Sequence, residues 1–112
     1  MGRLQGALMA KSRDYRTELL EGLRDPAEAA EYLEVALQEQ DREGFLLALR
    51  NVAEAQGGIG RLAERANLNR ETLYRTLSEE GNPELRSLEA ILRALGLRLS
   101  VEVEDRRDME QT

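Results

Sequence analysis

The sequence contains no cysteine and no histidine among its 112 residues. Zinc sites built on those ligands are therefore excluded, as are disulfides and the Ser-His-Asp and Cys-His arrangements of nucleophilic enzymes. Carboxylate pairs could still do acid–base chemistry. The 22 acidic residues, however, are scattered among arginines in helical patterns, as on solvated helix surfaces. We therefore expect no enzyme, no metal site and no cofactor.

Aromatic residues and long apolar runs are also scarce: tryptophan is absent, and there are one Phe and three Tyr. No run approaches the roughly 20 apolar residues that cross a membrane, and the N-terminus lacks the apolar core of a secretory signal. We expect a cytoplasmic protein that does not enter membranes. Leucine, alanine, glutamate and arginine dominate instead, which favours helix over strand. The length predicts one domain with a small core.

The net charge of −6 is unevenly distributed along the chain. Residues 1–58 carry 7 basic and 11 acidic groups, whereas residues 59–78 contain four arginines and two glutamates, which gives +2. The protein as a whole would not attract DNA. Any DNA binding must come from a local basic patch, with the acidic remainder facing away or meeting a basic partner.

Residues 25–98 are predicted to form a compact five-helix domain, after an arm at residues 1–24 that is partly flexible or forms a short helix. Asp25 and Pro26 are a strong helix start, because aspartate can cap a helix and proline suits its first position. That helix runs to about Glu39, and the next one ends at two glycines. The core residues predicted on these two helices are Ala29, Leu33, Ala36, Leu37, Phe45, Leu49, Val52 and Ala53.

Two short helices, expected at residues 59–66 and 70–78, follow with a three-residue turn between them. This arrangement fits a helix-turn-helix spanning residues 59–78. Ala63 supplies the small side chain needed where the helices cross. Asn67 lies where the turn requires a left-handed residue, and Asn69 can cap the second helix.

A fifth helix is predicted from a cap at Ser87 to about Leu95, with Gly96 ending it. The period then changes from helix to strand. One chain offers this strand no convincing partner, so residues 97–103 are predicted to be a dimerisation strand that pairs with a second copy. Residues 104–112 are expected to be a disordered tail. The alternating apolar residues of the strand are Leu97, Leu99, Val101 and Val103.

The runs "LYRTLSEEGNP" and "LEAILRALGLRL" resemble the addiction-module antidote family, the HigA-type antitoxins with a lambda-repressor-like helix-turn-helix. The likeness covers about residues 25–103. It implies the antitoxin of a type II toxin–antitoxin module, which neutralises a small basic RelE/ParE-like toxin by direct binding. It also implies a homodimer that binds double-stranded operator DNA and represses its own operon.

The resemblance also implies roles for single residues. Two residues would contact phosphates, Arg61 and Ser78. The sequence departs from the family at Gly60, where a capping serine or threonine is usual, and at Asn67, which replaces a glycine. Asn69 replaces a frequent capping serine. The residues that would read DNA are Asn69, Arg70, Glu71, Thr72 and Arg75.

Two other interpretations remain open on the residues themselves. The chain could be a stand-alone helix-turn-helix transcriptional regulator without a toxin partner, or an interaction protein that has lost DNA binding. Alternating arginine and glutamate are common on exposed helices, and Tyr74 could equally be half-buried core. A small basic reading frame next to the gene would favour the antitoxin, whereas an operator-binding measurement on Arg75→Ala would address the loss of DNA binding.

Overall fold

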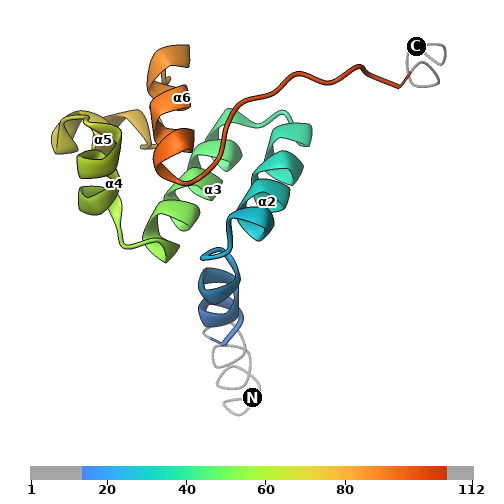
Figure 1. Cartoon of the computed structure of the whole chain (residues 1–112), viewed down its shortest axis with the longest axis horizontal. Coiled ribbons are helices and arrows are strands. Elements are labelled where there is room, and N and C mark those ends of the chain that lie inside the picture. The colour runs from blue at the N-terminus through green and yellow to red at the C-terminus, as the bar shows by residue number, and fades with distance from the viewer. Residues whose placement is uncertain (1–13, 106–112) are drawn as a thin grey trace, which may run out of the picture.

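The computed structural model describes residues 14–105, which form one all-helical domain (Figure 1). The mainly α architecture predicted from the sequence is confirmed. None of the helices in this range is long and apolar enough to cross a membrane. The six helices of the described range are a first helix at residues 14–22, α2 (Pro26–Gln38), α3 (Arg42–Ala55), α4 (Ile59–Ala66), α5 (Arg70–Thr76) and α6 (Leu85–Ala94).

The helix at residues 14–22 is packed against the rest of the domain. Leu23, directly after it, is 2 % exposed, and Leu19 packs against the same core. Arg16 reaches α3, where its Nη2 lies 2.7 Å from the Oε2 of Glu54. The second half of the predicted arm therefore belongs to the domain, whereas its first half, residues 1–13, lies outside the described residues.

Helix α3 lies at the centre of the core. Its Leu46, Leu49 and Val52 are fully buried, and it packs against both α2 and α4. Burial contributes about 1.5–3 kcal/mol for each large apolar side chain. The other buried apolar residues are Leu23, Ala29, Leu33, Ala48, Ala53, Leu62, Ala63, Leu73, Leu77, Ile91, Leu92 and Leu95.

Leu37 does not belong to this core, contrary to the prediction, since it is 53 % exposed. It stands about 80° around the helix from Ala29, at the edge of the buried face. Tyr32 packs against the core from α2 instead. Its hydroxyl accepts a 3.0 Å hydrogen bond from Nδ2 of Asn51 on α3, which satisfies the buried amide.

In the described range, four helices are followed by a residue at positive φ: α2 by Gln40 (φ 56°), and the three that end in a Schellman motif, α3, α4 and α6. Asn67, at the end of α4, has φ 56°, so the predicted left-handed turn is confirmed. Gly57 and Gly96, with φ 114° and 83°, end α3 and α6 in the same way. The following N–H donates back to a carbonyl five residues earlier, the bond that defines a Schellman motif. These bonds are Gly58 to Ala53 (2.8 Å), Leu68 to Ala63 (2.9 Å) and Leu97 to Leu92 (2.8 Å).

One predicted feature of the C-terminal part is wrong, and another, the strand that pairs with a second copy, stays a prediction. Helix α6 begins at Leu85 with Glu84 as its N-cap, three residues before the predicted cap Ser87. Proline breaks a helix in its interior but is tolerated near its start, so Pro83 does not prevent a helix from beginning at Leu85. Residues 97–103 leave α6 as an extended segment and form no strand within the described range. A strand requires hydrogen bonds to a neighbouring strand, and this single chain supplies none there.

Candidate nucleic-acid interface

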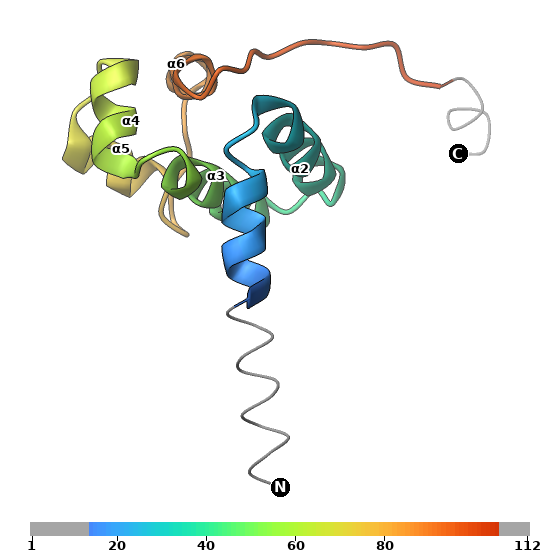
Figure 2. The same cartoon turned by 60° about the horizontal axis from the view of Figure 1, so that its bottom comes forward.

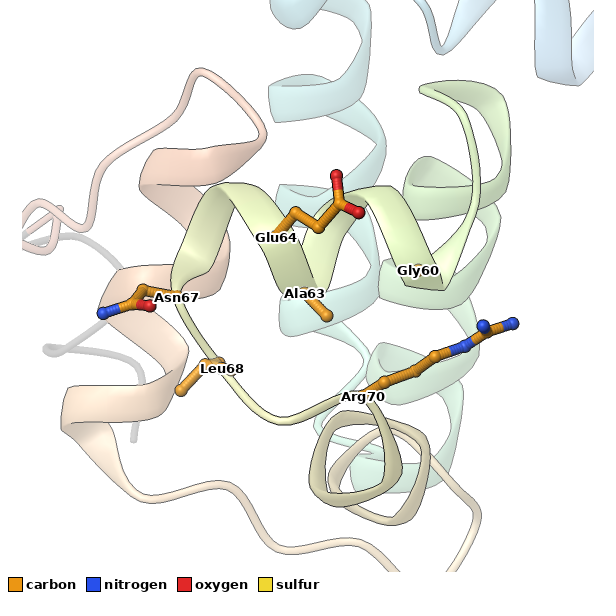
Figure 3. A pocket seen from close by; sticks show the side chains of 6 residues that line it. All are labelled: Gly60, Ala63, Glu64, Asn67, Leu68 and Arg70. Carbon is orange, nitrogen blue, oxygen red and sulfur yellow. The ribbon is translucent and has the colours of Figure 1, made fainter.

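The candidate site is the α4–α5 hairpin, residues 59–76, whose inner side is apolar. Leu62 and Ala63 of α4 and Leu73 of α5 are all buried, with exposures of 4 % or less. The side chain of Ala63 points toward the space between the two helices (Figure 3). A small residue there lets the helices approach closely, as predicted. Leu73 holds α5 to the core, so the opposite face of this seven-residue helix is left to solvent.

The turn of the hairpin uses its two asparagines differently. Asn67 is left-handed at φ 56° and ψ 44°, whereas Asn69 is extended at φ −68° and ψ 132°. The Oδ1 of Asn69 accepts hydrogen bonds from the N–H groups of Glu71 (2.8 Å) and Thr72 (3.2 Å). The predicted N-cap is thus confirmed, and such caps contribute about 1 kcal/mol. Because these two N–H groups are occupied by the cap, they are not available to a phosphate at the start of α5.

The five residues predicted to read DNA lie together on α5 and its cap, and all have exposed side chains. These residues are Asn69, Arg70, Glu71, Thr72 and Arg75. Arg75 lies in the last turn of α5, one helical turn away from Glu71 and Thr72. The structure therefore presents a continuous polar face on one short helix, which is the arrangement that the prediction required.

The two predicted phosphate contacts lie elsewhere. Arg61 is exposed on the first turn of α4, and its side chain covers Gly57: its Cδ is 2.7 Å from where a Cβ on that glycine would be. Ser78 is half-buried just past the C-terminal end of α5, where its hydroxyl donates a 2.7 Å hydrogen bond to the carbonyl of Arg75. Phosphate oxygens accept hydrogen bonds, so Ser78 would have to release this bond to donate to one.

Arg70 and Tyr74 form a pair on the outer face of α5. The guanidinium carbon of Arg70 lies 5.7 Å from the ring centroid of Tyr74, within the range of a cation–π contact. Tyr74 is 52 % exposed, so its interpretation as core is wrong. A Cβ on Gly60 would lie 3.6 Å from the same guanidinium carbon. The Arg70 side chain therefore extends from the start of α5 to the first turn of α4.

A shallow hollow of about 300 Å³ lies between α4 and the start of α5 (Figure 3). Glu64 stands on its wall, and Arg70 and Asn67 point away from it on opposite sides. A carboxylate at this place repels phosphate, so the hollow is a poor site for the DNA backbone. The lining residues are Gly60, Ala63, Glu64, Asn67, Leu68 and Arg70.

The sequence comparison misplaced the cap of α4. The N-cap is Gly58, with φ 97°, and Gly60 is the second residue inside the helix. Gly58 has no side chain to accept a hydrogen bond, so α4 begins without a side-chain cap. The missing side-chain cap therefore concerns Gly58, while Gly60 faces the Arg70 side chain at contact distance.

Two residues outside the hairpin hold the C-terminal end of α5, and neither was predicted. Arg50 of α3 donates from Nη1 to the carbonyl of Leu77, the C-cap residue of α5. This places a positive charge at the negative end of the helix dipole. Gly81 is buried against the same end: a Cβ there would lie 2.6 Å from the carbonyl carbon of Thr76. Arg50 had no sequence signal, whereas Gly81 was visible only as part of a loop.

The chain is similar to known proteins over the whole of this arrangement. A family model described as a probable addiction module antidote protein matches residues 15–103. An uncharacterized protein of Haemophilus influenzae is 34 % identical over 85 residues, which cover 76 % of this chain and 87 % of the relative. No solved structure matches the chain. On the family match and this relative, the chain belongs to the family of probable addiction module antidote proteins.

Proposed function

We propose that this protein is the antitoxin of a type II toxin–antitoxin module, and that it binds and neutralises a small basic RelE/ParE-like toxin. We also propose that it represses its own operon by binding operator DNA as a homodimer. Membership of the antidote family supports the first activity. The observation that carries the second is the exposed polar face of α5, held outward by a left-handed turn at Asn67 and a cap at Asn69.

In this proposal the α4–α5 hairpin is a lambda-repressor-like helix-turn-helix, and α5 enters the major groove. The buried Leu73 fixes the inner side of α5, so its outer side can face base edges. The hairpin and its flanks, residues 59–78, carry a charge of +2 in a protein of net charge −6. Local positive charge at a helix with a continuous polar face is what DNA binding by an acidic protein requires.

Each polar side chain of α5 then has a role that follows from its chemistry. Arg75 can donate two hydrogen bonds to guanine, and Thr72 can contact a thymine methyl group. Glu71 can accept from cytosine. Arg70 lies against Tyr74 and toward α4, so it is better placed for a phosphate at the edge of the groove than for a base. Arg61 would contact the backbone from α4.

Toxin binding would use a different part of the surface. Residues 25–39, which contain α2, carry five carboxylates and no basic residue. In residues 14–105 the one salt bridge joins Arg16 and Glu54, so the α2 carboxylates have no cationic partner within the described chain. Opposite charge would steer a basic toxin to this face and raise the association rate. The two activities would thus occupy separate surfaces.

A substitution that separates the two activities tests the proposal. Arg75→Ala is expected to weaken binding to a duplex from the region upstream of the gene by about 1–3 kcal/mol, because a bidentate arginine–guanine contact is lost. Exposed Arg86, on α6, gives the matched control Arg86→Ala, which should bind like the original protein. Both variants should still rescue growth when they are co-expressed with the toxin from the neighbouring reading frame.

Each negative result of these experiments would contradict a different part of the proposed function. Unchanged operator binding by Arg75→Ala would remove Arg75 from base reading, and no binding by the original protein would remove the repressor activity. Operator binding without any toxin-like neighbouring frame would favour the stand-alone transcriptional regulator. Rescue of growth without operator binding would leave an antitoxin that does not act on DNA.

A further inference from the structure

The extended segment at residues 97–103 has apolar side chains that the rest of the described chain leaves exposed. Val101 and Val103 are 99 % and 96 % exposed. The segment leaves α6 and runs past α2, away from the helices (Figure 2). No strand of the described range lies beside it. Exposed apolar residues on an unpaired, extended backbone are typical of a surface that pairs with another chain.

The sequence of this segment, LRLSVEV, is complementary to itself about Ser100. In an antiparallel pair of two copies centred on that residue, Arg98 lies opposite Glu102 of the partner subunit, and the same pair forms again on the other side. Leu97 faces the partner's Val103, and Leu99 faces the partner's Val101. Opposite charges and apolar residues across an antiparallel pair each stabilise it. Parallel pairing would instead place arginine beside arginine and glutamate beside glutamate.

An apolar groove lies directly beside the start of the segment. It has a volume of about 410 Å³ and lies between α2 and α6. Leu97, Arg98, Leu99 and Ser100 all line it, but only Leu97 among them packs against the core, so the apolar face of the segment is the better covered one. The side chain of Leu37, 53 % exposed, is also on its wall. Val101 and Val103 share the same face by the two-residue period of a strand, yet they lie past the groove of their own chain.

We propose that residues 97–103 of two copies form a two-stranded antiparallel ribbon centred on Ser100, with Val101 and Val103 of each copy covering the groove of the other. Directly opposite residues of a ribbon point to the same face, so the partner's Val101 and the partner's Val103 come to lie beside Leu99 and Leu97, over the groove. The groove thereby supplies the apolar burial that an isolated two-stranded ribbon lacks.

This ribbon deepens the proposed function, because it specifies the interface of the proposed homodimer. A two-fold axis through Ser100 and perpendicular to the ribbon leaves its faces unchanged. Both helical domains therefore lie on the same side, where two copies of α5 can address one DNA duplex. The pairing itself does not depend on DNA, so it can be tested without an operator.

Single cysteines test the register, since the chain has no cysteine of its own. In the ribbon, two copies of Ser100→Cys face each other, with Cβ atoms about 4.5–5.5 Å apart, close to disulfide distance. Two copies of Val103→Cys are six residues apart along the ribbon, about 20 Å. With oxidised glutathione as the oxidant, Ser100→Cys should become a disulfide-linked dimer and Val103→Cys should stay unlinked. A mixture of Leu97→Cys and Val103→Cys chains should form the mixed dimer.

A charge exchange tests the same register without cysteine. Arg98→Glu places like charges opposite each other twice and should weaken dimerisation, measured by sedimentation, by about tenfold. Adding Glu102→Arg to the same chain restores both opposite-charge pairs and should restore the dimer. Both positions are exposed, so folding is not at risk.

Three outcomes would overturn the proposal. The first is equal cross-linking of Ser100→Cys and Val103→Cys, and the second is no rescue in the double variant. The third is a protein that stays monomeric at every concentration and buries residues 97–103 only when a toxin is added. A failure of operator binding in a dimer that passes both tests would instead count against the DNA-binding part of the proposed function.

Discussion

At the scale of single residues, Asn67 and Asn69 are two positions apart and need opposite backbone conformations. Asn67 is left-handed, which costs an L residue with a Cβ roughly 1–2 kcal/mol and costs asparagine less. Asn69 is extended and caps the start of α5 with its side-chain oxygen. Asparagine is thus used at Asn67 because it tolerates the left-handed backbone, and at Asn69 because its side-chain oxygen accepts hydrogen bonds.

Exchanging the side chain at Asn67 separates these two properties. Asn67→Ala should lower the free energy of unfolding by about 1 kcal/mol, because alanine tolerates the left-handed conformation less well. Asn67→Gly should leave stability unchanged or raise it slightly, since glycine adopts this conformation freely but loses entropy on folding. Urea unfolding of the three proteins measures both effects. A glycine variant as unstable as the alanine variant would show that the asparagine side chain, and not its backbone, stabilises the turn.

The same scale shows what could be predicted about the site. The roles of Asn67 and Asn69 follow from their own backbone and side-chain preferences, so the sequence alone indicated them. Arg50 acts on the carbonyl of Leu77, 27 residues away, and no local pattern reports such a contact. Ser78 was expected to contact a phosphate, but its hydroxyl donates a hydrogen bond to the carbonyl of Arg75, three residues earlier.

At the scale of elements, the end of α5 depends on the close approach of a loop. Gly81 lies where any Cβ would press on the carbonyl of Thr76, and the carbonyl oxygen of Arg75 is 3.0 Å from the same position. Both atoms belong to the backbone of the helix or its end, so they cannot rotate away. The glycine of the Gly-Asn-Pro run therefore stands where α5 and the loop meet, and the orientation of α5 depends on it.

Two glycine-to-alanine substitutions measure this dependence. Gly81→Ala should destabilise the protein by about 2 kcal/mol or more, because α5 or the loop must shift. Gly60→Ala, inside α4, should stabilise it by up to about 1 kcal/mol, since alanine favours helix and its Cβ would meet Arg70 at 3.6 Å, an ordinary contact. Thermal unfolding of the two variants gives the comparison. If both changes had the same sign, helix propensity and not steric approach would decide the outcome.

The elements themselves differed in how well the sequence predicted them. The helices α2 to α5 were predicted closely because each combines a helical apolar period with a start or stop signal such as Asp25-Pro26 or Asn67. Helix α6 starts earlier than expected because Glu84, and not Ser87, accepts its first backbone hydrogen bond, from the N–H of Leu88, and no side-chain cap is needed. Residues 97–103 have the period of a strand, but period determines only which face is apolar, and hydrogen bonding requires a second strand.

At the scale of the whole molecule, charge is divided between two regions. Residues 59–78 carry +2, and residues 25–39 carry five carboxylates and no basic side chain. Like charges at neighbouring helical positions, such as Glu28 and Glu31 on α2, destabilise a helix slightly. Asp25 and Glu28 at the start of α2 favour the helix, but Glu31, Glu34 and Glu39 lie beyond its first turn and have no cationic partner in residues 14–105. An acidic face retained at that cost is consistent with a basic partner.

The association rate with the proposed basic toxin should therefore depend on where charge is removed. Replacing Glu28 and Glu31 by glutamine should slow association about threefold at low ionic strength, with little effect at high salt, because the opposite charge that steers the encounter is lost. The matched control replaces Glu79 and Glu80, which are exposed in the loop after α5, by glutamine. It removes the same charge outside α2, so the toxin should associate at nearly the original rate. Stopped-flow fluorescence at several salt concentrations measures all three proteins. Equal slowing by both double variants would mean that net charge alone attracts the toxin and that the toxin does not bind at α2.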